Sequence, residues 1–261
     1  MKLLALIFAY ALSHFISKPQ RFRKFGWFKS WSTWVLNHTK FFYDELTVII
    51  IVGLPVFFIS VFLLSVFTSL LGGLIVAILI LSYCIGPKSF EEDVFSGELR
   101  KRIGVRANAG ISTLIKKMTQ VSLRRWFGVF FWYVVLGILG ALLYRFSERL
   151  DAYTSDNERI KPAISKLVKI LNYPVAWMMV ISLAIASDFE RIYKKCKPFM
   201  SLDNIYSMDD SFLYDATDFA VENCEVESNN DSSIEQVSIR VLKRMLVVWL
   251  VFVAILVILA I

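Results

Sequence analysis

"FFWYVVLGILGALLYRFSERLDAY", Phe130–Tyr153, begins as an apolar helix and ends in charged side chains. Its small and polar residues recur at helical spacing, which places them on one face of a continuous helix. The residues of this face are Gly137, Gly140, Ala141, Tyr144, Glu148 and Asp151. Gly137 and Ala141 form a small-xxx-small pair, which lets another helix approach closely. Arg145, three residues before Glu148, is placed to form an ion pair at the membrane boundary.

The composition of the 261-residue chain indicates a protein that crosses a membrane several times. Hydrophobic residues make up 57% of it and gather in long blocks, whereas a soluble domain is closer to half apolar. The three cysteines lie far apart, without the spacing of a disulfide framework or a zinc site. Because the chain has only two histidines, His14 and His38, a histidine-rich metal site is excluded.

The apolar blocks predict about four to six spans in an all-α, polytopic transmembrane protein with a cytoplasmic polar helical region. Residues 47–85 contain no charge, and the glycines of SLLGG divide them into a hairpin of two helices. The first block is short, and we interpret it as an uncleaved helix. The expected spans are 3–17, 47–67, 72–86, 126–146, 172–187 and 245–261.

Polar segments 18–46, 87–125 and 188–244 lie between the spans. Segment 18–46 mixes basic and aromatic side chains, a mixture that nucleic-acid-binding proteins also use. A segment lying on the cytoplasmic membrane surface explains it better, so we expect no nucleic acid. Segment 87–125 carries nine basic and four acidic side chains, which places it in the cytoplasm as well.

The direction of the chain between residues 126 and 187 is left open by the sequence. Six full crossings put 147–171 outside, although this segment carries five basic residues. The alternative is that 126–146 and 172–187 do not both cross fully.

No other pattern in the chain predicts catalysis. Residues 203–235 contain ten acidic and no basic side chains, which could bind a divalent cation through oxygen atoms. They lack the EF-hand spacing, and a solvated helix and loop is favoured. A phosphate-binding glycine loop is also missing. We assign no catalytic residue and expect no cofactor and no metal ion.

The string that ends at Tyr144 and Arg145 resembles the signature of the AmpE and CobD/CbiB membrane-protein superfamily. The matching residues are Phe131, Trp132, Gly137, Gly140, Ala141, Leu142, Tyr144 and Arg145. LNYPVAWMM (171–179), SDFERIYKKC (187–196) and the C-terminal apolar block resemble segments of the AmpE branch. The resemblance implies a protein of the bacterial inner membrane with a signalling role, linked to cell-wall recycling, β-lactamase induction and the response to antibiotics.

The CobD/CbiB branch consists of adenosylcobinamide-phosphate synthases, ATP-dependent amide-forming ligases of cobalamin biosynthesis. Its members carry Asn-Thr-Leu-Asp after the Tyr-Arg pair, where this chain has Glu148, Arg149, Leu150 and Asp151. Trp177 stands where an arginine is expected. The lost carboxylates and arginine are ligands suited to Mg–ATP, so an AmpE-like protein without enzymatic activity is favoured. A ligase and a non-catalytic membrane scaffold remain the alternatives.

The resemblance and the shared helix face define one candidate functional motif. Its residues are Trp132, Gly137, Gly140, Ala141, Tyr144, Arg145, Glu148, Asp151 and Asn172. We expect Arg145 to bind an anionic group and Asp151 to hold a cation or a hydrogen-bond donor. The expected partners are the lipid bilayer and either a periplasmic or cytoplasmic signalling partner or a cell-wall fragment.

Overall fold

The computed structural model describes residues 4–9, 25–39, 44–66, 70–85, 99–106, 109–200, 208, 210–227 and 234–259. Every element in these ranges is a helix, so the predicted all-α class is confirmed for the described residues. Three described segments are long and apolar enough to cross a membrane: Asp44–Leu63, Ile111–Tyr153 and Lys161–Ala186. Gly72–Ile85 is a shorter apolar helix. The number and direction of the crossings stay predictions.

The chain forms two compact units, each built from two separate stretches of sequence. The first unit consists of residues 1–87 and 128–171, and the second of residues 88–127 and 172–261. All candidate motif residues except Asn172 belong to the first unit.

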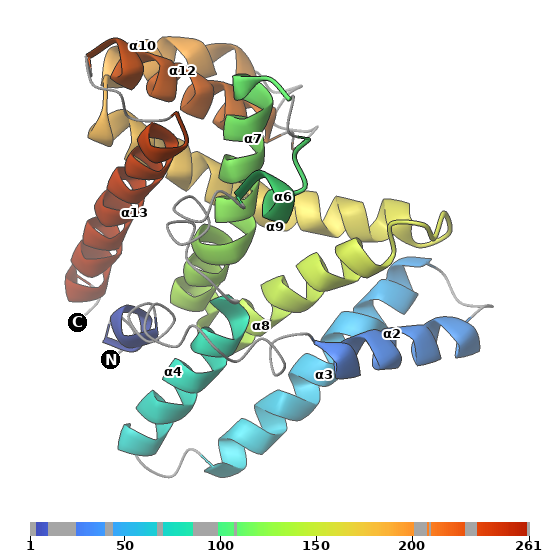
Figure 1. Cartoon of the computed structure of the whole chain (residues 1–261). Helices are drawn as coiled ribbons and strands as arrows, with labels where there is room; N and C mark the ends of the chain where they lie inside the picture. The colour runs from blue at the N-terminus through green and yellow to red at the C-terminus, as the bar shows by residue number, and fades with distance from the viewer. Residues whose placement is uncertain are drawn as a thin grey trace. The chain divides into compact units, whose positions relative to one another are not determined.

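Helix α8 (Gly128–Tyr153) is the element on which the first unit is assembled. Helices α2 (Gly26–His38), α3 (Asp44–Val66) and α4 (Leu70–Ile85) all pack against it (Figure 1). The bounds of α3 and α4 confirm the two helices predicted at 47–67 and 72–86. Helix α3 begins with Asp44 and Glu45, whose charges favour a helix N-terminus.

Helix α8 reverses direction at Gly137. This residue has φ 70° and ψ −154°, a backbone conformation that essentially only glycine adopts. A methyl group on Gly128 would overlap the ring of Tyr144, and one on Gly140 would overlap the carbonyl oxygen of Trp132. Residues 128 and 144 would lie about 24 Å apart along a straight helix. The element is therefore a hairpin of two arms, residues 128–136 and 138–153 (Figure 1).

The reversal corrects two sequence predictions. Residues 126–146 do not form one straight span, because the backbone leaves the helical conformation at Gly137. Gly137 also does not share a helix face with Gly140 and Ala141, because the helical repeat is interrupted between them. Gly140 is closely packed, but its neighbour is Trp132 of the same element and not a separate helix. An apolar sequence with helical spacing conceals such a turn, since both arms satisfy the same periodicity.

The remaining boundaries differ mainly at helix starts. Helix α9 (Lys161–Ala186) begins well before the expected span at 172–187, and α13 (Ile234–Leu259) begins before 245–261. Both helices extend in their N-terminal direction into sequence that carries charges. Residues 147–171 are accordingly mostly helical, shared between the ends of α8 and α9. Of the predicted first span, residues 4–9 are helical and the rest lies outside the described residues.

The second unit contains helix α12 (Ser211–Glu227), against which other helices of this unit pack. Its other elements are α6 (Leu99–Ile103), α7 (Ile111–Ser122), η1 (Leu123–Phe127), the remainder of α9, α10 (Phe189–Cys196), η2 (Lys197–Met200) and α13. Lys116 of α7 forms an ion pair of 3.1 Å with Asp215 of α12, and Ser112 donates a hydrogen bond to Asp218. The acidic stretch is therefore not simply solvated: α12 buries one face, and two of its aspartates meet α7.

Candidate functional site

The second arm of α8 carries an ion pair that is almost completely buried. The Nη1 atom of Arg145 lies 3.0 Å from Oε2 of Glu148, one helical turn further along. The Arg145 side chain is 2% exposed and that of Glu148 is 13% exposed. The spacing of these two residues predicts the pair, and the structure contains it. Glu148 thus occupies the place of the anionic group that we expected Arg145 to bind.

A second arginine shares the same carboxylate. Nε of Arg149 lies 3.8 Å from Oε2 of Glu148, and this side chain is 26% exposed. Two guanidinium groups therefore face one carboxylate, which leaves an excess of one positive charge among these three residues. The Nε atoms of Arg145 and Arg149 are both buried and have no hydrogen-bond partner among the described residues. A buried donor without a partner costs roughly 1–3 kcal/mol.

Phe25 covers both arginines. The guanidinium carbon of Arg145 lies 5.7 Å from the centre of its ring, and that of Arg149 lies 5.2 Å away. These distances suit cation–π attraction. Phe25 adopts φ 47° and ψ 32° just before α2, a left-handed conformation that is strained for a bulky side chain. We refer to Phe25, Arg145, Glu148 and Arg149 as the arginine cluster.

Asp151, one turn beyond Glu148, is neutralised by the start of α9. Nζ of Lys161 lies 2.7 Å from Oδ1 of Asp151, and the hydroxyl of Ser165 donates to the same oxygen at 3.1 Å. Lys161 also donates to the backbone carbonyl of Asp151 at 2.7 Å. The aspartate, which is 8% exposed, therefore holds a cation and a donor that both come from the chain itself.

The turn between α8 and α9 is attached to the start of α3. Nε of Arg159 lies 2.8 Å from Oδ1 of Asp44, and its Nη2 donates to the carbonyl of Thr39 at 2.9 Å. The side chain of Asn157 accepts a hydrogen bond from the backbone N–H of Arg159. These contacts fix the helix ends that carry Asp151 and Lys161.

The other motif residues serve the packing of the hairpin. The indole Nε1 of Trp132 donates to the carbonyl of Leu171 in α9 at 3.1 Å, which attaches the first arm. Tyr144 is 1% exposed and its ring lies against Gly128 of the opposite arm. Ala141 is fully buried. Asn172 is buried in α9 but belongs to the second unit.

Sequence reasoning missed Phe25, Arg149, Lys161 and Ser165 as neighbours of the motif. Arg149 lies between two motif residues, so its charge was a usable signal. Phe25 is distant in sequence, and nothing in its local pattern distinguishes it from the other aromatic residues of segment 18–46. Lys161 and Ser165 are four apart in the polar start of α9, where they share one helix face.

Comparison with known proteins does not identify this chain. No protein-family model matches its sequence, and no curated protein and no solved structure matches it either. The AmpE-like role thus rests on the motif resemblance alone.

Proposed function

We propose that the protein is a non-catalytic, multi-pass membrane protein that senses an anionic ligand through its arginine cluster. The observation that carries this proposal is the imbalance of a buried and a partly exposed arginine against one carboxylate, with an Nε on each that makes no hydrogen bond to the described residues. A negatively charged group beside Arg149, the more exposed of the two, would neutralise the excess charge. In keeping with the motif resemblance, the signal would concern cell-wall recycling and β-lactamase induction at the bacterial inner membrane.

The carboxylates favour a sensor over the ligase alternative. A ligase of the CobD/CbiB type needs groups that bind Mg–ATP and its substrate. Glu148 and Asp151, which remain from that pattern, are already held by Arg145 and Lys161. A deletion strain that loses the ability to make cobalamin from cobyric acid would favour the ligase, whereas unchanged synthesis would remove it.

The hairpin supports a particular membrane topology. Its turn is surrounded by exposed apolar side chains, Val135, Leu136 and Leu139, while its second arm ends in charges. Such a hairpin suits re-entrant insertion, with the turn in the hydrocarbon and both flanks on one membrane face. We therefore place segments 87–125 and 147–171 together in the cytoplasm, which agrees with their basic residues.

The contacts of α7 with α12 support the same topology. The ion pair between Lys116 and Asp215 supports the placement of α7 and α12 on one side of the membrane. An even number of crossings must then separate them. If the hairpin does not cross, α9 does not cross either. Ser155, exposed in the turn between α8 and α9, tests this: Ser155→Cys should react with a membrane-impermeant maleimide only after the membrane is permeabilised.

The signalling role is tested in the bacterium that encodes the protein. Arg145→Ala and Arg149→Ala should each change β-lactam-induced β-lactamase activity without lowering the amount of protein. Arg191→Ala is the matched control, since Arg191 is an exposed arginine of α10 that pairs with Asp188. Unchanged induction in both cluster variants, at normal protein levels, would overturn the signalling proposal.

A scaffold without any ligand is the remaining alternative. The close packing of Gly140 against Trp132 is the observation in its favour. It predicts that Gly140→Leu impairs assembly while Arg145→Ala has no effect on signalling. The two sets of variants therefore separate a sensor from a scaffold.

A further inference from the structure

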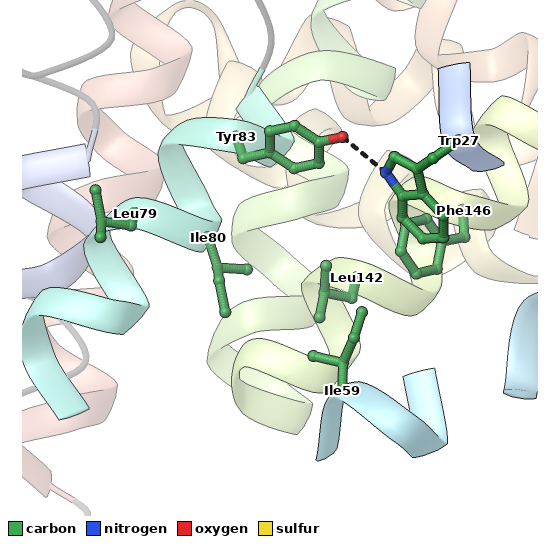
Figure 2. A pocket seen from close by; sticks show the side chains of 7 residues that line it. All are labelled: Trp27, Ile59, Leu79, Ile80, Tyr83, Leu142 and Phe146. Atoms are coloured by element: carbon green, nitrogen blue, oxygen red, sulfur yellow. Dashed lines mark hydrogen bonds between the residues drawn. The ribbon is translucent and has the colours of Figure 1, made fainter. Parts of the chain in front are cut away.

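An apolar pocket of about 250 Å³ lies within the first unit, beside the arginine cluster. Seven side chains from α2, α3, α4 and α8 line it: Trp27, Ile59, Leu79, Ile80, Tyr83, Leu142 and Phe146 (Figure 2). Only two of them carry a polar group, and these bond to each other, since the indole Nε1 of Trp27 donates to the Tyr83 hydroxyl at 3.2 Å. Its lining therefore suits hydrocarbon, and its volume is slightly below the range of roughly 300–1,000 Å³ common for small-molecule pockets.

Two aromatic rings that line this pocket also contact Phe25 of the arginine cluster. The ring of Tyr83 lies 4.4 Å from that of Phe25, centre to centre, and the ring of Phe146 lies 6.2 Å from it. Phe25 in turn covers the guanidinium groups of Arg145 and Arg149. One ring thus separates an apolar pocket from a site with excess positive charge.

The helices around the pocket expose apolar side chains. Leu79, which lines the pocket, is 59% exposed, and Ile75 on the same helix is 58% exposed. Phe57, Phe58 and Phe62 of α3 are exposed as well. Exposed apolar side chains on two apolar helices indicate contact with lipid. A ligand could therefore reach the pocket sideways from the bilayer.

We propose that this pocket binds the hydrocarbon chain of an anionic membrane lipid, whose headgroup lies at Arg149. The proposal rests on the proposed anion-sensing function and names the chemical class of its ligand. Charge complementarity selects the anionic lipid: the described cluster has one positive charge in excess, and Lys29 lies above the Tyr153 ring at 6.0 Å. Basic clusters beside membrane helices attract anionic headgroups, and tryptophan residues such as Trp27 are enriched at the interface.

The test is photo-cross-linking of the full chain in vesicles. The probe is phosphatidylglycerol with a diazirine at the middle of one acyl chain, compared with phosphatidylcholine that carries the same chain. Mass spectrometry then locates the cross-linked residues. We expect phosphatidylglycerol to label Leu79, Ile80 and Leu142 more strongly than phosphatidylcholine does. Equal labelling by both probes, or labelling spread evenly over all exposed apolar helices, would overturn the proposal.

Matched variants distinguish the site for the lipid acyl chain from the site for the headgroup. Ile80→Trp fills the pocket and should lower labelling of Leu142 by about tenfold, whereas Ile75→Trp, on the same helix outside the pocket, should leave it unchanged. Arg149→Gln should remove the preference for phosphatidylglycerol, and Arg191→Gln should keep it.

The two kinds of failure are distinguishable. If Arg149→Gln abolishes the preference but Ile80→Trp has no effect, the anion site stands and the pocket assignment fails. If neither variant changes labelling, both the lipid site and the proposed anion site fail at these residues. Circular dichroism and gel filtration of each variant exclude loss of folding as the cause.

Discussion

A double-mutant cycle between Gly128 and Tyr144 tests whether the two arms of α8 touch. Gly128→Ala adds a methyl group where the ring of Tyr144 already lies, and this ring is buried, at 1% exposure. Overpacking of this kind typically costs roughly 1–3 kcal/mol. Tyr144→Leu removes the overlapping ring atoms, and alone it should cost a similar amount through lost burial, roughly 1–3 kcal/mol.

The double variant should be more stable than the sum of the two single changes predicts. In the Tyr144→Leu background the added methyl group occupies space that the ring has left. We expect a favourable coupling energy of about 1–2 kcal/mol, within the range of roughly 0.5–3 kcal/mol seen for residues in contact. The assay is unfolding of the full chain in mixed micelles with increasing dodecyl sulfate, followed by far-ultraviolet circular dichroism.

Gly53→Ala is the matched control. Gly53 lies inside α3, and a methyl group there meets only Cγ2 of Ile49 at 3.9 Å. This change should be neutral or stabilising by up to about 1 kcal/mol, the helix propensity difference. Additivity of Gly128→Ala and Tyr144→Leu within about 0.5 kcal/mol would refute contact between the arms.

Three further predictions concern the turn, the second ion pair and a buried thiol. Gly137→Ala should lower the free energy of unfolding in the same assay by roughly 1–3 kcal/mol, because alanine does not readily adopt φ 70° with ψ −154°. A loss of stability no larger than that caused by Gly53→Ala would contradict a turn at Gly137. Lys161→Ala should destabilise by about 1–3 kcal/mol, because the buried Asp151 carboxylate loses the cation that lies 2.7 Å away. Asp151→Asn should recover part of this loss, and equal losses in the single and double variants would exclude the pair. Burial, with the Asp215 carboxylate as a second cause, raises the pKa of the Cys196 thiol to about 11. Since the thiolate is the reactive form, its alkylation by iodoacetamide in the folded protein, followed by peptide mass spectrometry, should accelerate up to pH 10 without a plateau; a plateau near pH 8.5 would contradict the burial.

Helices and contacts that depend on local sequence pattern could be predicted from the sequence. The charge-free run from residue 47 to 85 predicts α3 and α4, because it is about long enough for two membrane helices and its glycines divide it. The spacing of Arg145 and Glu148 predicts their ion pair, because residues three apart are neighbours on a helix. The polar starts of α9 and α13 were missed, since hydropathy locates apolar residues and not helix ends.

What depends on contacts distant in sequence could not be predicted. The apolar sequence around Gly137 suits one straight helix and two arms equally well, because glycine tolerates both conformations. The contact of Phe25 with Arg145 joins residues that no spacing rule connects. Lys161 was visible as a basic residue, but its pairing with Asp151 depends on how the chain turns between α8 and α9. The arginine cluster therefore emerged only from the fold.

A distance measured across Gly137 tests whether α8 reverses direction there. Phe131 lies in the first arm and Ala152 near the end of the second, where it is exposed. Spin labels at these two positions, in the full chain reconstituted in vesicles, are measured by double electron–electron resonance. A hairpin whose arms pack side by side predicts a distance below about 20 Å. A single straight helix would give about 32 Å, and that result would contradict the reversal of α8.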